Sequence, residues 1–250
     1  MMKVSAAVLG FVLFAGSASA ADIKVLSTGN MQTILGQLTA DFERTSGHTL
    51  KIEYGSTPRI KARAETEAAD LTINERYVLD DLLKQGRVVA GTIIDIARSP
   101  FAIGVGAIAP KPDVSSLDAL KRTLLAAASI AQPDSAGGAQ DGTFFVSLIG
   151  QLGIADQVKP KIKLTQGGDN AAKLVASGGA QMGVAQRRNF MSLPSVAMLE
   201  PLPDLPGFKF LMVAGVVTGA RERDGALAFA RYLAAPARAE IIKANGMETY

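Results

Sequence analysis

The stretch LKIEYGSTPRIKARAETE, Leu50–Glu67, sets the pattern that much of the chain repeats. Its first letters, LKIEY, alternate apolar and polar residues, which predicts a short strand. Ser56 or Thr57 then suits the N-cap of a helix, and Pro58 suits its first turn. A helix that begins there directs free backbone N–H groups beyond the end of the strand. With two hydroxyls and Arg59 at the same place, we predict an anion-binding turn; an ordinary strand-to-helix turn is the alternative.

The same pattern of strand, small polar turn and helix recurs along the chain. Four such turns are found at Ser27–Asn30, Gly55–Pro58, Ser135–Gly138 and Gly167–Asn170. In parallel sheets covered by helices, ligands bind beyond the carboxyl ends of the strands. We therefore expect the four turns to border one cleft for an anion or another polar ligand.

Breaks in the alternation of strands and helices divide the chain into two lobes. We predict an α/β fold in which each lobe has a central, mostly parallel sheet flanked by helices. Lobe one comprises residues 21–104 and 213–250, and lobe two comprises residues 105–212, with a hinge near Val105 and Leu211. Residues 92–97 and 101–108 read as two strands joined at Ser99-Pro100.

The first twenty residues have the pattern of a cleaved secretory signal. Lys3 provides a positive start, residues 4–16 are apolar but too few to span a bilayer, and an Ala-x-Ala pattern ends at Ala20. We expect removal of residues 1–20 and a periplasmic location; a membrane anchor or a buried helix is the alternative. The chain has no cysteine, so an exported form would depend on its core rather than on disulfides.

Composition argues against several kinds of chemistry. The formal net charge is only +3, without a basic stripe interleaved with aromatics, so we expect no nucleic-acid partner. With no cysteine and the single histidine His48, expected to be solvated in a loop, the usual zinc and copper sites cannot be built. The acidic residues are scattered and predict no acid–base pair. We expect no metal, no cofactor and no enzymatic activity.

Several short stretches occur in an order typical of a known family. They are Val25–Met31, Tyr54–Thr57, Ala69–Leu71, Pro133–Gly138, Gly168–Ala171, Ser177–Ala185 and Ala228–Gly246. This ordered set resembles the extracellular solute-binding proteins of ABC importers and is most similar to the periplasmic molybdate-binding branch. The resemblance implies a type II periplasmic-binding fold, a monomer, a small anionic ligand held between the lobes, and a membrane permease as partner.

The resemblance also implies the ligand-binding residues. These are Thr28, Asn30, Ser56 and Thr57 from lobe one, with Arg59 as a further candidate, and Ala136, Gly137, Asn170, Ala171 and Gln186 from lobe two. Whether Arg59 and Arg187 contact the ligand is left open.

Two residues depart from the pattern of the molybdate-binding branch. Asn30 stands where that branch has a serine, and Gln186 stands where it has a tyrosine. Amides both donate and accept hydrogen bonds, so the ligand is either a molybdate-like oxyanion or a small organic carboxylate. The alternative function is a secreted enzyme that reuses the fold, for which a buried acid–base pair in the cleft would be the sign. The ligand-sensing domain of a transcription regulator conflicts with the signal sequence.

Overall fold

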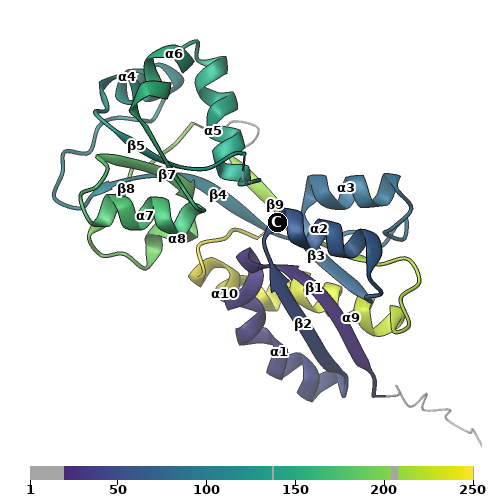
Figure 1. Cartoon of the computed structure of the whole chain (residues 1–250). Helices are drawn as coiled ribbons and strands as arrows, with labels where there is room; N and C mark the ends of the chain where they lie inside the picture. Colours follow the sequence, from purple (N-terminus) through teal and green to yellow (C-terminus); the bar gives the residue numbers. More distant parts are fainter. Residues whose placement is uncertain (1–19, 137, 204–207, 250) are drawn as a thin grey trace, which may run out of the picture.

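Two long strands, β4 (Ile94–Gly106) and β9 (Lys209–Val216), run through the centre of the molecule and connect two lobes (Figure 1). The computed structural model describes residues 20–136, 138–203 and 208–249. Residues 1–19 of the predicted signal sequence lie outside the described residues. None of the helices within the described ranges is long and apolar enough to cross a membrane.

Lobe one is built from both ends of the chain, which appear purple to blue and yellow in Figure 1. Its sheet has the order β2-β1-β3-β9-β4, in which β1 is parallel to β2 and β3 while β9 is antiparallel to β3 and β4. Its other elements are β1 (Asp22–Thr28), η1 (Gly29–Met31), α1 (Gln32–Ser46), β2 (Thr49–Gly55), α2 (Thr57–Thr66), β3 (Leu71–Glu75), α3 (Arg76–Lys84), α9 (Arg223–Ala234), η3 (Pro236–Arg238) and α10 (Ala239–Ala244).

Lobe two is formed by the middle of the chain. Its sheet has the order β4-β7-β5-β6, with β5 parallel to β6 and β7, and with β7 and β8 antiparallel to β4. Its elements are α4 (Leu117–Ala126), β5 (Ile130–Pro133), α5 (Gln140–Gln151), α6 (Ala155–Val158), η2 (Lys159–Lys161), β6 (Ile162–Thr165), α7 (Gly168–Ala176), β7 (Met182–Gln186), α8 (Arg187–Met191) and β8 (Val196–Met198). Each lobe thus has three parallel strands, extended by the antiparallel strands that join the lobes.

The prediction of two strands joined at Ser99-Pro100 was wrong, because β4 is continuous. Its first part, Ile94–Pro100, pairs with β9, and its second part, Phe101–Val105, pairs with β7. Pro100 lies at this change of partner, where the strand tolerates a residue that has no N–H to donate. The predicted lobe boundary at 104/105 lies a few residues after the change of partner, and the position of the hinge stays a prediction.

Each lobe has its own hydrophobic core. In lobe one, Phe42 and Phe229 are buried, with ring centroids 4.8 Å apart. In lobe two, the fully buried Phe145 packs in a cluster that includes Phe101. His48, expected to be solvated, is instead half-buried, because its ring stacks on Phe42 at 6.3 Å between centroids.

Candidate functional site

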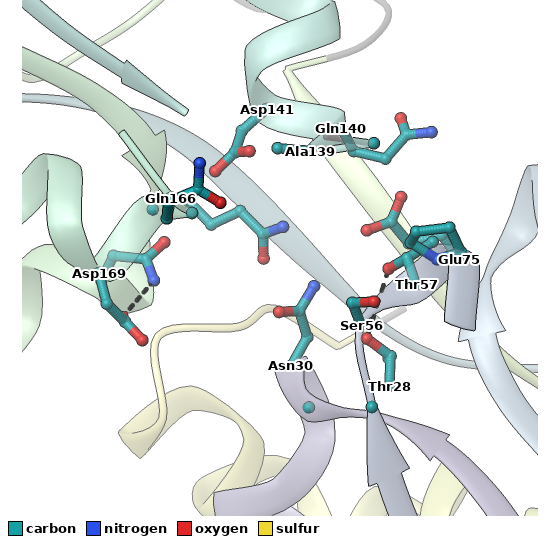
Figure 2. A pocket seen from close by; sticks show the side chains of 18 of the residues that line it. Thr28, Asn30, Ser56, Thr57, Glu75, Ala139, Gln140, Asp141, Gln166 and Asp169 are labelled. Carbon is teal, nitrogen blue, oxygen red and sulfur yellow. Dashed lines mark hydrogen bonds between the residues drawn. The ribbon is translucent and has the colours of Figure 1, made fainter. Parts of the chain in front are cut away.

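A cleft of about 640 Å³ separates the two lobes at the carboxyl ends of their parallel strands. From lobe one, its wall is formed by the ends of β1, β2 and β3 and the residues that follow them. From lobe two, it is formed by the segments that follow β5, β6 and β7. Figure 2 shows side chains from both lobes pointing into this space. All four small polar turns picked out in the sequence contribute residues to the wall.

Among the helices that begin at the cleft wall are α2 after Ser56, α5 after Ala139 and α7 after Gly167. None of these three residues caps its helix through a side chain: alanine and glycine have no hydroxyl, and Ser56 makes no capping hydrogen bond. The positive ends of three helix dipoles therefore converge on the cleft, an arrangement that favours negative charge.

Five of the predicted ligand-binding residues line the cleft: Thr28, Asn30, Ser56, Thr57 and Gln186. The hydroxyl oxygens of Thr28 and Thr57 are 3.4 Å apart, so the ends of β1 and the start of α2 meet at one point (Figure 2). Gln186 is buried and its Oε1 accepts a hydrogen bond of 2.7 Å from Ser99 Oγ. This bond holds the Gln186 side chain against the strand that joins the lobes.

Four other predicted residues are not among the described residues that form the cleft wall. The fifth, Gly137, lies outside the described residues. Arg59 is on the exposed face of α2. The Ala136 N–H donates to Asp134 Oδ1 at 3.0 Å, and Asn170 Nδ2 donates to the Gln166 carbonyl at 2.8 Å. Ala171 is fully buried in lobe two. In both turns, neighbouring residues form the wall instead, among them Gly138, Ala139, Gly167 and Gly168.

The structure separates the two adjacent arginines, Arg187 and Arg188. Arg187 forms an ion pair of 3.0 Å with Glu200 and is not among the residues of the cleft wall that the structure describes. Arg188 lines the cleft, and its Nη2 donates a hydrogen bond of 2.5 Å to Asn30 Oδ1 across the lobes. Burial lowers the pKa of Arg188, whereas Asp169, Asp141 and Glu75 act to raise it. Arg188 therefore supplies a positive charge to the cleft.

Glu75 and Asp141 are two buried carboxyl groups on opposite sides of the cleft (Figure 2). Glu75 is 3% exposed; burial, together with the charge of Asp141, raises its pKa to about 8, while Arg188 acts in the opposite direction. Burial also raises the pKa of Asp141, against the hydrogen bond that the Gly142 N–H donates to it at 3.1 Å. Glu75 is therefore mostly neutral at pH 7.

The expectation that the chain has no inward-facing pair of acidic residues was wrong. Glu75 ends β3 in lobe one and Asp141 lies in the first turn of α5 in lobe two, so only the closed fold brings them to the same cleft. Glu75 lies at the end of a strand and Asp141 at the start of a helix, and these positions were the available signal. Both positions also suit an ordinary acidic residue near a helix start.

Asn189 is fixed by a neighbouring acidic residue. Its Nδ2 donates a hydrogen bond of 2.6 Å to Asp169 Oδ1, drawn as a dashed line in Figure 2. Its Oδ1 is buried and has no hydrogen-bond partner among the described residues. A Cβ atom on Gly168 would lie 2.6 Å from Asn189 Oδ1 and 3.0 Å from Asp141 Oδ2. Gly168 thus lets both oxygens approach the backbone at the start of α7.

A sequence model of the family described as bacterial extracellular solute-binding protein matches residues 23–248, nearly the whole described chain. The chain belongs to this family. The resemblance and the fold class predicted from the sequence are thereby confirmed.

The relatives of this chain carry names that state different functions. The chain is 28% identical over 232 residues to an aconitate isomerase from Pseudomonas sp., covering 90% of this chain and 87% of the relative. It is also 28% identical over 256 residues to the molybdate-binding protein ModA of Azotobacter vinelandii, covering 95% and 94%. The structure of the tungstate-binding protein TupA from Desulfovibrio alaskensis G20 matches with a TM-score of 0.73 at 17% identity, covering 89% of this chain and 94% of that one. Such structural likeness establishes the fold alone.

Among the described residues, no group of three or more histidine, cysteine, aspartate or glutamate side chains is arranged to hold a metal ion.

Proposed function

We propose that this solute-binding protein is the periplasmic component of an ABC importer and binds a small organic anion in the cleft between its lobes. The observation that carries the proposal is the position of Arg188, whose guanidinium lies in the same cleft as the starts of α2, α5 and α7. The charge of Arg188 and the positive ends of these helices favour a carboxylate or an oxyanion at their part of the cleft, whose wall also carries the carboxyl groups of Glu75, Asp134, Asp141 and Asp169.

The remaining parts of the proposal follow from the family and from the sequence. Cleavage after Ala20 would release a monomer into the periplasm, and closure of the lobes around the anion would create the surface that docks on a membrane permease. Thr28, Asn30, Ser56 and Thr57 would bind the anion from lobe one. Gln186 and the backbone at the starts of α5 and α7 would do so from lobe two.

A thermal-shift series on the mature protein tests the proposal. The ligands are molybdate, tungstate, sulfate, phosphate, succinate, malate and citrate. A ligand at 100 times its Kd adds about 2.7 kcal/mol to the free energy of unfolding, which raises Tm by several degrees. We expect such a rise with at least one carboxylate. No rise with any member of the series contradicts an anion as the ligand.

A second candidate function is isomerisation of an unsaturated carboxylate, and the pair of Glu75 and Asp141 favours it. A carboxylate at Asp141 can take a proton from a carbon of the ligand as the double bond shifts. Neutral Glu75 donates its own proton to the carbon at the other end of the allylic system. The composition of the ligand is unchanged, and the proton has moved from Glu75 to Asp141. The aconitate isomerase among the relatives is consistent with such a reaction.

Proton NMR of the protein incubated with either aconitate isomer tests this second candidate. Formation of the other isomer, abolished by Asp141→Asn, supports it. If neither isomer is converted while carboxylates still raise Tm, the second candidate is rejected and the transport function stands.

A further inference from the structure

We infer that the cleft selects a carboxylate ligand that also carries a hydrogen-bond donor, a hydroxyl or an undissociated acid group, and discriminates against donor-free anions such as molybdate. This inference rests on the proposed function and names the class of ligand. It is carried by two oxygen atoms, Asp141 Oδ2 and Asn189 Oδ1, which we call the acceptor pair.

The acceptor pair lies at one point of the cleft wall. Both oxygens border the α-carbon of Gly168, at the start of α7, closely enough that a Cβ there would be 3.0 Å from one and 2.6 Å from the other. Asp141 is 6% exposed and Asn189 is 4% exposed, and both line the cleft. A ligand group that reaches this point therefore meets two buried oxygens.

The orientation of Asn189 is fixed by its surroundings. Because the carboxylate of Asp169 only accepts, the group that faces it at 2.6 Å must be the donating Nδ2. Asn189 Oδ1 then points toward Gly168 and Asp141, where the described residues offer it no donor. A buried acceptor without a partner is costly, and a ligand donor supplies the missing partner.

The hydrogen-bonding groups of the cleft wall discriminate in the same direction. Its described residues carry four carboxyl groups, on Glu75, Asp134, Asp141 and Asp169, and a single guanidinium, on Arg188. A fully deprotonated tetrahedral oxyanion has only acceptors, so it can use Arg188 and the helix starts but offers no donor to Asp141 and leaves Asn189 Oδ1 unpaired. A hydroxy-carboxylate places its carboxylate on Arg188 and its hydroxyl on the acceptor pair.

Matched ligands that differ only in a hydroxyl test the inference in the wild-type protein. Malate is compared with succinate, and citrate with tricarballylate, by isothermal titration calorimetry; molybdate is the donor-free oxyanion. We expect the hydroxylated member of at least one pair to bind tenfold or more tightly than its partner and than molybdate, because sites built around a ligand hydroxyl reject analogues that lack it. Equal or tighter binding of every donor-free member, or of molybdate, overturns the inference while leaving the proposed function intact.

Substitution of Asp141 by asparagine tests the residue assignment. Asp141→Asn removes the charge and adds a donor next to Asn189, so the preference for the hydroxylated ligand should fall at least fivefold. Asp118→Asn is the matched control, because Asp118 also lies in the first turn of a lobe-two helix but is not among the cleft residues described. An unchanged preference in Asp141→Asn contradicts the assignment. Absence of binding by every ligand of the series counts instead against the proposed function itself, and the inference falls with it.

Discussion

Arg188 in lobe two donates a hydrogen bond of 2.5 Å to the Oδ1 atom of Asn30 in lobe one, so one residue both charges the cleft and joins its walls. A second contact lies nearby, where a Cβ atom on Gly138 of lobe two would be only 3.1 Å from Pro58 of lobe one. The lobes therefore touch through the same segments that border the ligand space.

Loss of the charge of Arg188 should weaken anion binding. In Arg188→Gln, we expect Kd for the best carboxylate to rise at least tenfold, because the cleft loses the one guanidinium on its described wall. Arg187→Gln is the matched control, since Arg187 pairs with Glu200 away from the cleft. Calorimetric titration of both variants decides the matter, and similar Kd values for the two would contradict the role of Arg188.

Removal of the hydroxyls at the start of α2 should also weaken binding. We expect the double variant Ser56→Ala/Thr57→Ala to lose at least tenfold in affinity, because both residues line the cleft at the positive end of this helix. Thr66→Ala, at the other end of the same helix, is the control. An unchanged affinity in the double variant would show that these hydroxyls do not bind the ligand.

The raised pKa of Glu75 predicts how the free energy of unfolding changes with pH. The folded state holds the proton of Glu75 up to a pKa of about 8, whereas the ordinary value is 4.5. Between these values the folded state binds more protons than the unfolded state, so this residue lowers the free energy of unfolding by about 1.4 kcal/mol per pH unit as pH rises. Its contribution is fully present below pH 4.5 and is lost by about pH 8.

The variant Glu75→Gln removes that dependence. We expect its Tm to exceed that of the wild type at pH 8 and the difference to shrink as pH falls toward 4.5, measured without ligand by differential scanning calorimetry. Glu240→Gln, at an exposed position, is the control. A Tm difference that is constant over this pH range would show that Glu75 is charged in the folded protein.

Two glycine-to-alanine substitutions compare a crowded position at the cleft with an open position elsewhere. Gly168→Ala places a methyl group 2.6 Å from Asn189 Oδ1, so Asn189 must move, and we expect affinity to fall at least tenfold. Gly150→Ala, inside α5, meets nothing within 4 Å and should stabilise the protein by about 0.5–1 kcal/mol. Kd and Tm of both variants test this; if Gly168→Ala binds normally, the close approach at the start of α7 has no role in binding.

Local patterns predicted most of the elements and the side of the fold where the cleft lies. The strand and helix around Ser56 were predicted because alternation, a hydroxyl and Pro58 act within a few residues. The side chain of Ser116, which stands just ahead of an apolar periodic run, caps α4 by accepting a hydrogen bond from the Ala119 N–H. Thr28 and Asn30 lie at the cleft because Thr28 ends β1 and Asn30 follows that strand.

Local sequence patterns could not identify residues whose role depends on partners far away in the chain. Whether Arg187 or Arg188 faces the cleft depends on the direction in which α8 leaves β7, where Phe190 of α8 packs against Ala102 of β4 and Ala172 of α7. Asn170 was expected to bind the ligand, but a helical turn directs its side chain back to Gln166. The pKa of Glu75 is raised by burial and by the charge of Asp141 in the other lobe, so no local pattern marks it.

Lobe one takes its β9 strand and its α9 and α10 helices from the last residues of the chain. Without the residues from Lys209 onward, the strands of lobe two are all present, whereas β3 has an open edge and Ile94–Pro100 of β4 has no partner. Lobe one therefore depends on strands from both parts of the chain. A chain that stops before Lys209 would expose that unpaired edge to other molecules.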